Sequence, residues 1–125
     1  MQLDSVRLFV TDLHAARQFY AGVLALPLVA DGSAHGYCVF ACGAVQLVVE
    51  AVAPDAPADD QALVGRFTGL SFTVDDAAAT CTDWMARGVP FTGLPERQFW
   101  GGILATFLDP SGNQLQIVQR PAAAG

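Results

Sequence analysis

The fold is decided by two stretches that share one pattern: Val6-Arg7-Leu8-Phe9-Val10-Thr11-Asp12 and Leu70-Ser71-Phe72-Thr73-Val74-Asp75-Asp76. Each reads as an alternating strand that runs into an aspartate at the start of a helix. Asp12 and Asp76 are 64 residues apart (76 − 12), and Tyr20 and Trp84 are separated by the same spacing (84 − 20). Two copies are too few for a long solenoid. We therefore expect them to pair into one pseudo-symmetric domain.

The bulk composition indicates a single globular domain. The chain has 125 residues, of which 53% are hydrophobic and 14% charged, and this length is enough to bury a sizeable core. No apolar run approaches the ~18 residues that would span a bilayer, and Met1-Gln2-Leu3-Asp4 lacks the basic start of a signal peptide. We expect a cytoplasmic protein that has no membrane partner. Three cysteines (Cys38, Cys42 and Cys81) are then expected to be buried, reduced thiols.

The chain is acidic overall. The net charge is −6, from 12 acidic and 6 basic residues, and all the basic residues are arginines. A chain without a basic patch has little to neutralise phosphates, so nucleic acid is not expected as a partner. A cationic or neutral small ligand is easier to accommodate than a polyanion. Solubility alone would also explain the acidity.

The pattern predicts a β-α-β-β-β order for both modules. For the first module (about 1–50) we expect strands over 5–10, 27–30, 36–41 and 44–50, with a helix from Asp12 to about Leu24 that is stopped by Pro27. Residues 51–66 have weak periodicity and read as a linker. For the second module (about 67–121) we expect strands over 67–74, 89–92, 96–108 and 114–119, with a helix over 76–87 that ends at Gly88. Gly101-Gly102 suggests a bulge or a bend within the long strand, and the last residues, 121–125, are expected to fray.

One face of each predicted sheet is much more polar than the other. Val6, Leu8 and Val10, and their counterparts Leu70, Phe72 and Val74, are expected to face the helices. By alternation, the other face carries Ser5, Arg7, Phe9, Gln46, Val48, Glu50, Gly69, Ser71, Thr73, Gln114, Gln116 and Val118. An antiparallel sheet with one solvated face would show this pattern. A sheet curved around a wet cavity would show it too, and the repeat favours that interpretation.

The chain resembles the vicinal oxygen chelate superfamily, which includes glyoxalase I, bleomycin-resistance proteins and extradiol dioxygenases. The first module carries the resemblance in Val10-Thr11-Asp12-Leu13, Phe19-Tyr20 and Leu24-Ala25-Leu26. The second module carries it in Trp100-Gly101, in Phe107-Leu108-Asp109-Pro110-Ser111-Gly112-Asn113 and in Leu115-Gln116-Ile117. The resemblance implies an α+β fold in which two tandem β-α-β-β-β modules form a curved, partly open mixed-sheet barrel around a cleft.

The resemblance also implies four positions for metal ligands, one on the first and one on the last strand of each module. They fall on Ser5, Gln46, Gly69 and Gln116. Metal-dependent relatives carry imidazole and carboxylate groups there. Two amides, a hydroxyl and a missing side chain are a poor site for a divalent metal, and a register error that substitutes Glu50 for Gln46 would add only one carboxylate. His14 and His35 are expected to be exposed. We therefore expect neither a metal nor another cofactor.

The candidate ligand-binding residues are those that we place on or near the cleft: Trp100, Arg7, Phe9, Tyr37, Gln46, Glu50, Phe99 and Gln116. Arg7 and Glu50 would form a buried pair, or either would anchor an oppositely charged ligand group. Phe9, Tyr37, Phe99 and Trp100 would form an aromatic wall or pack in the core. Trp100, before Gly-Gly at the predicted rim, is the best single contact, whereas Trp84 is expected to be structural. No Ser-His-Asp or Cys-His pattern indicates a nucleophile, so the catalytic residues stay unknown.

Two functions remain open. In the first, a metal-free protein binds and sequesters a small organic, antibiotic-like molecule in the cleft between the sheets. In the second, the chain is an enzyme of the superfamily, such as a lyase, dioxygenase or isomerase that acts on a small oxygenated metabolite. A homodimer is expected because sheet edges need to be covered. A monomer with internally paired modules is the competing interpretation.

Overall fold

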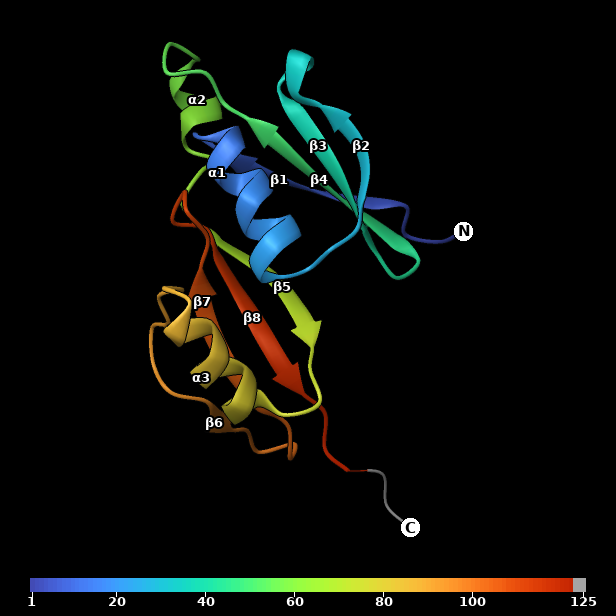
Figure 1. Ribbon diagram of the computed structural model, residues 1–125, viewed down its shortest axis with the longest axis vertical. Coiled ribbons are helices and arrows are strands. Elements are labelled where there is room, and N and C mark those ends of the chain that lie inside the picture. The colour runs from blue at the N-terminus through green and yellow to red at the C-terminus, as the bar shows by residue number, and fades with distance from the viewer. Residues whose placement is uncertain (123–125) are drawn as a thin grey trace. The chain divides into compact units, whose positions relative to one another are not determined.

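The structure is a computed structural model that describes residues 1–122, and it contains two four-stranded sheets (Figure 1). The elements are β1 Ser5–Val10, α1 Leu13–Gln18, a π-helical turn Phe19–Val23, β2 Leu28–Gly32, a 3₁₀ turn Ser33–His35, β3 Tyr37–Cys42, β4 Val45–Ala51, α2 Ala58–Gln61, β5 Phe67–Thr73, α3 Ala77–Ala86, β6 Glu96–Arg97, β7 Ile103–Leu108 and β8 Gln114–Gln119. The chain divides into two units. The first comprises residues 1–66 and 110–113, and the second comprises 67–109 and the residues from Gln114 onward.

The two sheets repeat one topology. The first has the strand order β1-β4-β3-β2 and the second has β5-β8-β7-β6. In each sheet the first pair is parallel and the other pairs are antiparallel. The predicted α+β fold and the order β-α-β-β-β are therefore confirmed, and each sheet is open. The predicted cleft between the two modules stays a prediction.

Both main helices begin at the predicted aspartates. The Asp12 carboxylate accepts a hydrogen bond from the backbone N–H of Ala15, and Asp76 does the same for Ala79, each at 3.0 Å. Such an N-cap satisfies a donor that the first helical turn leaves without a partner. Gly88, with φ of 89°, ends α3 in the left-handed region as predicted.

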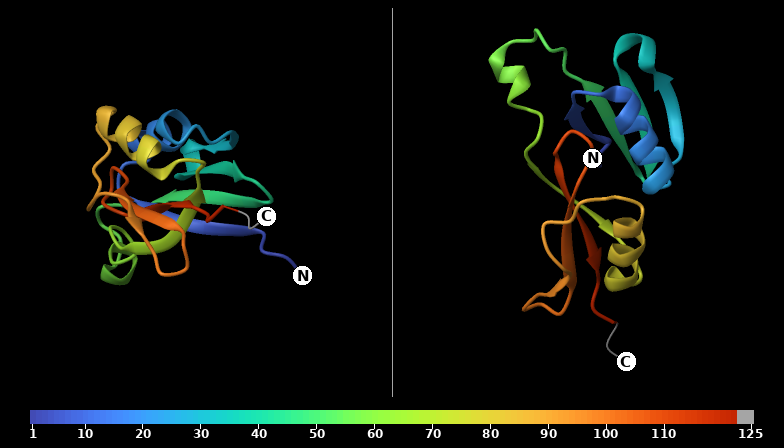
Figure 2. Two further views of the ribbon diagram at one scale, coloured as in Figure 1. Left: turned by 90° about the horizontal axis from the view of Figure 1, so that it is seen from below. Right: turned by 60° about the vertical axis from the view of Figure 1, so that its left-hand side comes forward.

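The spacing of 64 residues also places one aromatic side chain in each core. Tyr20 lies against Phe40 of β3, with ring centroids 5.9 Å apart, and Trp84 lies edge-on to Phe107 of β7 at 5.1 Å. Tyr20, Phe40 and Phe107 are fully buried. Both views in Figure 2 show each helix on one face of its own sheet, the face that carries the buried residues of β4 and β8. The opposite face of each sheet is left open by its own helix.

Two strand predictions for the second module were wrong. The strand expected over 89–92 is reduced to a single bridge between Phe91 and Phe107, in part because Pro90 has no N–H to extend the ladder. The long strand expected over 96–108 is instead a hairpin, in which β6 pairs with β7. Gly101, with φ of 93°, donates its N–H to the Gln98 carbonyl at 2.9 Å. Of the two predicted alternatives, a bulge or a bend, the structure has a bend at Gly101, and the chain reverses there.

The predicted linker, residues 51–66, contains one short helix. Its middle forms the short helix α2, and the Gln61 side chain donates to the carbonyls of Ala53 and Pro54 at 2.8 and 3.0 Å. These bonds hold the linker in one conformation. The expected fraying of 121–125 falls partly outside the described residues.

The cysteines are free thiols. Cys38 and Cys81 are buried as predicted, whereas Cys42 is only half-buried. Burial raises the pKa of the Cys42 and Cys81 thiols, which lowers the share of reactive thiolate. The prediction of packing rather than reactive cysteines is thus confirmed for Cys38 and Cys81.

Candidate functional site

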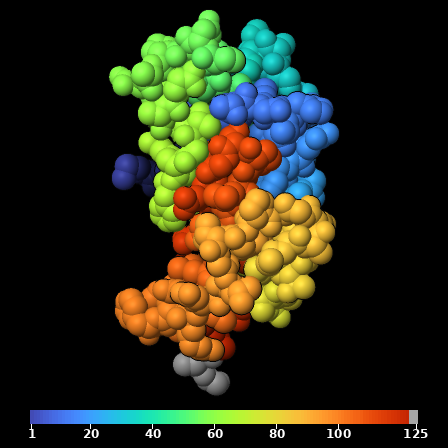
Figure 3. All heavy atoms as spheres, turned by 90° about the vertical axis from the view of Figure 1, so that its left-hand side faces the viewer, coloured from blue at the N-terminus to red at the C-terminus, as the bar shows by residue number. Residues whose placement is uncertain are grey.

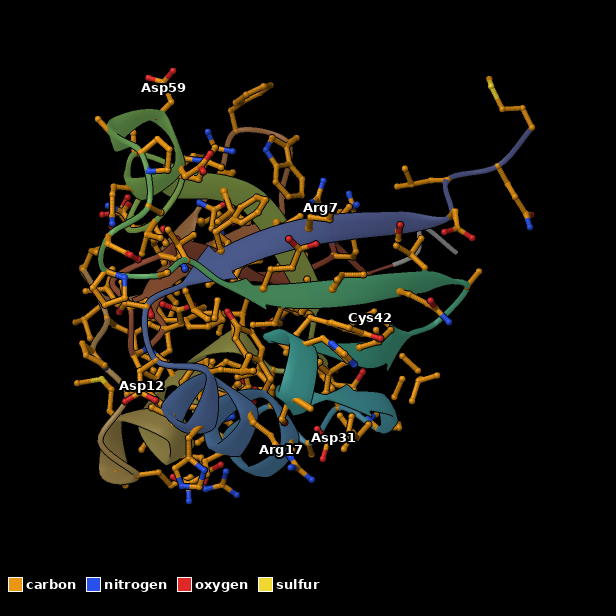
Figure 4. All side chains as sticks on the ribbon, turned by 90° about the horizontal axis from the view of Figure 1, so that it is seen from above. Arg7, Asp12, Arg17, Asp31, Cys42 and Asp59 are labelled. Atoms are coloured by element: carbon orange, nitrogen blue, oxygen red, sulfur yellow. The ribbon has the colours of Figure 1, made fainter. Side chains whose placement is uncertain are left out.

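The open face of the first sheet carries a row of three predicted site residues. The strand register places Phe9 opposite Glu50, and Glu50 opposite Tyr37. Because side chains alternate along a strand, these three point to the same side. Arg7 lies two residues before Phe9 on the same face. Figure 4 shows Arg7 on the side of the sheet away from α1, as the alternation predicts.

Arg7 and Glu50 form a bidentate ion pair. The Nε and Nη2 atoms of Arg7 donate to the two carboxylate oxygens of Glu50, each at 2.8 Å. The Arg7 guanidinium carbon also lies 5.3 Å from the centre of the Phe9 ring, in cation–π contact. The hydrogen bonds and the charge of Glu50 raise the pKa of Arg7. The predicted pairing is therefore correct, but its predicted burial is wrong, because the Arg7 and Glu50 side chains are 61% and 29% exposed.

A hollow of about 440 Å³ lies beside this pair. One wall is the sheet, with Arg7, Phe9 and Glu50. The other wall is the linker, which contributes Asp60 and Leu63, and the whole lining is Arg7, Phe9, Glu50, Ala51, Val52, Ala53, Ala56, Asp60 and Leu63. The volume is in the range of ordinary ligand pockets. The hollow combines an apolar floor, one aromatic ring and three charged groups.

Asn113 connects the two walls of this hollow. Its Nδ2 donates to the Phe9 carbonyl at 2.8 Å, and its Oδ1 accepts from the backbone N–H of Gly65, also at 2.8 Å. Next to it, the Thr11 backbone N–H donates to the Ser111 hydroxyl at 3.0 Å. Asn113 is 1% exposed. The turn at 110–113 therefore holds the end of β1 and the end of the linker in place.

The second unit has a hollow of about 300 Å³ on the open face of its sheet. It is lined by Thr92, Gly93, Leu94, Glu96, Gln98, Leu104, Ala105, Thr106 and Gln116. Gln116 is a predicted site residue, and its carboxamide lies between two hydroxyls: it accepts from Ser71 at 3.4 Å and donates to Thr106 at 3.2 Å. This hollow is therefore polar and nearly uncharged, unlike the hollow in the first unit.

Trp100 and Phe99 lie in the turn between β6 and β7. Phe99 is fully exposed, and Trp100 is 38% exposed. The Trp100 ring covers Gly102, where an added Cβ would lie 1.8 Å from the indole, and Arg120 lies 5.9 Å from the ring centre. Figure 3 shows the segment around this turn, in orange, projecting from the second unit. Of the predicted aromatic wall, Phe9 and Tyr37 belong to the first unit and Trp100 and Phe99 to the second, and the wall itself stays a prediction.

The four positions that the resemblance assigns to metal ligands do not fit a divalent metal. Ser5 and Gln46 are opposite one another in the β1–β4 pair, whereas Gln116 is opposite Ser71. Gly69, with φ of 75°, lies where the β5–β8 register shifts. These positions provide no carboxylate, imidazole or thiolate. Within residues 1–122, no group of three or more His, Cys, Asp or Glu residues is placed to hold a metal ion.

The histidines and the remaining ion pairs lie away from the open faces. His14 and His35 are exposed, as predicted. Arg17 pairs with Asp31 at 2.8 Å on the side of the first sheet that α1 covers (Figure 4). The backbone N–H and hydroxyl of Ser33 also donate to Asp31, and these bonds lower the pKa of Asp31. This cluster ties α1 to β2 and lies outside both hollows.

Sequence reasoning missed three residues that line the hollows, and it missed the role of Asn113, which holds the first hollow together. Asp60 and Leu63 were assigned to a linker, and the only signal for them was the aspartate-rich composition of that stretch. Thr106 lies within a predicted strand, and its position beside Gln116 depends on the register between β7 and β8. Asn113 was quoted only as part of the motif at the final hairpin. All four residues take their positions from contacts with segments far away in the chain. The alternation within a single strand does not specify such contacts.

The sequence matches the Glyoxalase/Bleomycin resistance protein/Dioxygenase superfamily over residues 2–117. No curated protein matches the chain. Among solved structures, a member of this superfamily from Sphaerobacter thermophilus DSM 20745 is 28% identical with a TM-score of 0.78, and the match covers 96% of this chain and 98% of that one. TnmS3, an antibiotic binding protein from Streptomyces sp. CB03234, is 28% identical with a TM-score of 0.76, covering 98% and 97%.

An enzyme is also among the similar structures. Lactoylglutathione lyase from Agrobacterium tumefaciens is 23% identical with a TM-score of 0.75, and the match covers 94% of this chain and 92% of that one. At this identity the likeness shows the fold alone. The chain belongs to the glyoxalase/bleomycin resistance protein/dioxygenase superfamily.

Among the described residues there is no helix long and apolar enough to cross a membrane.

Proposed function

We propose that this chain binds a small, antibiotic-like organic molecule in the hollow of the first unit and does so without a metal. The observation that carries the proposal is the Arg7–Glu50 pair beside the Phe9 ring, at the edge of a hollow of about 440 Å³. The similarity to TnmS3, which is described as an antibiotic binding protein, supports it.

The charges of the hollow favour a flat ligand with a cationic group. Glu50 and Asp60 provide two carboxylates and Arg7 provides one guanidinium, so these lining groups carry one net negative charge. A carboxylate has about four lone-pair positions, so Glu50 can accept from a ligand while it stays bonded to Arg7. The Phe9 ring would stack on a planar group. Such contacts correspond to micromolar to millimolar affinity after ordering costs.

Benzamidine and benzamide test this proposal because they have nearly the same shape and differ in charge. We expect Glu50→Gln to weaken benzamidine by about tenfold and benzamide far less, because the substitution removes the carboxylate that the cation would contact. The same substitution also removes one of the two acceptors for Arg7, and this loss is common to both probes. Phe9→Ala should weaken both probes. Binding is followed by NMR titration of the labelled protein.

Asp59→Asn is the matched control, since Asp59 lies on α2 and is exposed but does not line the hollow. It should leave both affinities unchanged. Equal loss in Glu50→Gln and Asp59→Asn would mean that general acidity attracts the probe, which would contradict the assignment of the site. Contact between Trp100 and the ligand, which the sequence predicts, stays a prediction. A change in Trp100 fluorescence during the same titration would support that contact.

The absence of a metal is part of the proposal. Elemental analysis of protein purified without chelator should show far less than one equivalent of zinc, nickel, manganese or iron, because the four ligand positions carry neutral or absent donors. Stoichiometric metal that is lost in Gln46→Ala or Gln116→Ala would refute this expectation. The alternative function, a superfamily enzyme, would then become the favoured one.

We also propose a homodimer. Leu28 and Val29, on the edge strand β2, are 37% and 52% exposed, and an apolar sheet edge is commonly covered by a partner. Sedimentation at micromolar concentration should therefore show a particle of twice the chain mass of 13.1 kDa. A single species at the mass of one chain would support the competing monomer.

A further inference from the structure

We propose that the ligand of the first hollow carries a planar amidinium or guanidinium group, and that this group displaces the guanidinium of Arg7. This inference rests on the proposed function, to which it adds the class of cation and the role of Arg7 as an internal competitor. Its basis is that Arg7 already contacts both groups that the ligand would use, the Glu50 carboxylate and the Phe9 ring.

The contact with Glu50 indicates which shape of cation fits. Nε and Nη2 of Arg7 donate to the two carboxylate oxygens of Glu50, each at 2.8 Å. A planar cation makes this double contact because its two N–H groups lie in one plane, side by side. An amidinium has the same two N–H groups and can reproduce both bonds. An ammonium group is a compact point charge that lacks this planar fork, so it fits the carboxylate less well.

The contact with Phe9 shows that Arg7 also covers the aromatic surface. The guanidinium carbon lies over the Phe9 ring, 5.3 Å from its centre, and guanidinium planes are attracted to aromatic faces. The covered face is the one beside Glu50, since the same guanidinium contacts both groups. A ligand that pairs with Glu50 and stacks on Phe9 at the same time needs this face, so Arg7 has to leave it.

Arg7 is free to move into the solvent. Its side chain is 61% exposed, and within residues 1–122 Glu50 is the one residue to which it donates hydrogen bonds. An exposed ion pair adds little stability, because water solvates the separated charges well. Glu50 also keeps lone pairs for a first contact while Arg7 is in place. The double contact and the ring face become available to the ligand once Arg7 has left.

The displacement of Arg7 sets the affinity of the hollow. An apparent dissociation constant equals the intrinsic one divided by the fraction of molecules that is open for binding. For an exposed bidentate pair with a cation–π contact, Arg7 is in place in roughly three quarters to nine tenths of the molecules, which weakens binding by about fourfold to tenfold. A cation that matches Glu50 and Phe9 poorly is therefore rejected in favour of Arg7.

Benzamidine and benzylamine test the class of cation, because both carry a phenyl ring and one positive charge and they differ in the shape of the charged group. NMR titration of the ¹⁵N-labelled full chain should give tighter binding for benzamidine than for benzylamine. Arg7→Thr should strengthen benzamidine by about fourfold to tenfold, because Glu50 and Phe9 are then unoccupied in the free protein. Arg7 is exposed, so this variant is expected to fold.

Two further variants separate displacement from simple charge repulsion. Arg7→Lys keeps the positive charge and loses the planar fork, so it should strengthen benzamidine by about twofold to fourfold. If Arg7 acted only by repelling the probe, Arg7→Lys would bind like the parent chain. Arg66→Thr is the matched control, because it removes the same charge from an exposed residue that does not line the hollow. It should leave the affinity unchanged.

The Nε–H signal of Arg7 reports the displacement directly. It is the arginine side-chain signal that is missing from the ¹⁵N spectrum of Arg7→Thr. Glu50→Ala gives its position when the carboxylate partner is absent. As benzamidine saturates the parent chain, the signal should move toward that position, because the ligand then holds Glu50 in place of Arg7.

Any of three results overturns this inference and leaves the proposed function in place. The first is that benzamidine binds the parent chain and Arg7→Thr equally well. The second is that the Arg7 signal does not move when benzamidine saturates the parent chain. The third is that benzylamine binds as tightly as benzamidine. A different result, in which benzamidine binds neither the parent chain nor Arg7→Thr, would overturn the proposed function and this inference together.

Discussion

Replacing Asn113 with alanine is expected to lower the free energy of unfolding by about 2–4 kcal/mol. Asn113 is nearly fully buried, and its side chain satisfies the Phe9 carbonyl and the Gly65 N–H at 2.8 Å each. Its removal leaves both backbone groups without their partner, and a buried unsatisfied group costs about 1–3 kcal/mol. Urea unfolding followed by circular dichroism measures the change.

Gln61→Ala is the matched control for Asn113. Gln61 also donates from a side-chain amide to two carbonyls, of Ala53 and Pro54, at similar distances, but it lies at the surface, where water can replace the lost bonds. It should cost less than about 1 kcal/mol. If the two variants lost equal stability, burial would not be the reason for the importance of Asn113.

Asn113→Ala should also weaken the binding of benzamidine to the fraction of the protein that stays folded, since Asn113 holds both walls of the first hollow.

Replacing Trp84 with alanine is expected to cost about 3 kcal/mol. Its ring lies edge-on to the buried Phe107, with centroids 5.1 Å apart, and it also contacts Phe91 at 6.5 Å. Truncation would leave a cavity between α3 and its sheet, and large-to-alanine substitutions in cores cost about 3–5 kcal/mol. The lower end applies because Trp84 is half-buried. Thermal unfolding of the variant gives the measurement.

Trp100→Ala provides the comparison for Trp84→Ala. Trp100 lies at the surface on Gly102 in the turn between β6 and β7, so its loss should cost about 1 kcal/mol or less. A larger loss from Trp100→Ala than from Trp84→Ala would show that the turn, and not the helix-facing core, stabilises the second unit. This pair of variants also separates the structural tryptophan from the candidate contact.

Local pattern was enough to predict much of the candidate site. Alternation along β1 and β4 placed Arg7, Phe9 and Glu50 on one face, and the structure brings these three together. Such a prediction works because the two-residue period of a strand is a property of each short segment. The exposure of the pair was not predictable in this way. Whether a charged side chain on the open face is covered depends on which distant segment lies over it.

The hairpin in the second unit shows the opposite case. Residues 89–92 and 96–108 have apolar patterns typical of strands, and the first of these is nevertheless reduced to one bridge. Short apolar runs are ambiguous because burial selects apolar residues whether or not a ladder forms. The Gly-Gly pair was recognised as a break, but its left-handed glycine allows a reversal as well as a bulge. Pairing with β7 decided between the two.

By itself, the sequence determined the repeated β-α-β-β-β order, the aspartate caps of α1 and α3, and the side of each strand on which the polar residues lie. These depend on residue type and on periods of two and 3.6 residues, which act over a few neighbours. Only the tertiary structure decided that α2 and Asp60 form one wall of the first hollow, that Asn113 joins its two walls, and that Gln116 lies between two hydroxyls. These features join residues that are far apart in the chain, and their formation depends on strand register and on the closure of long loops, which no local pattern encodes.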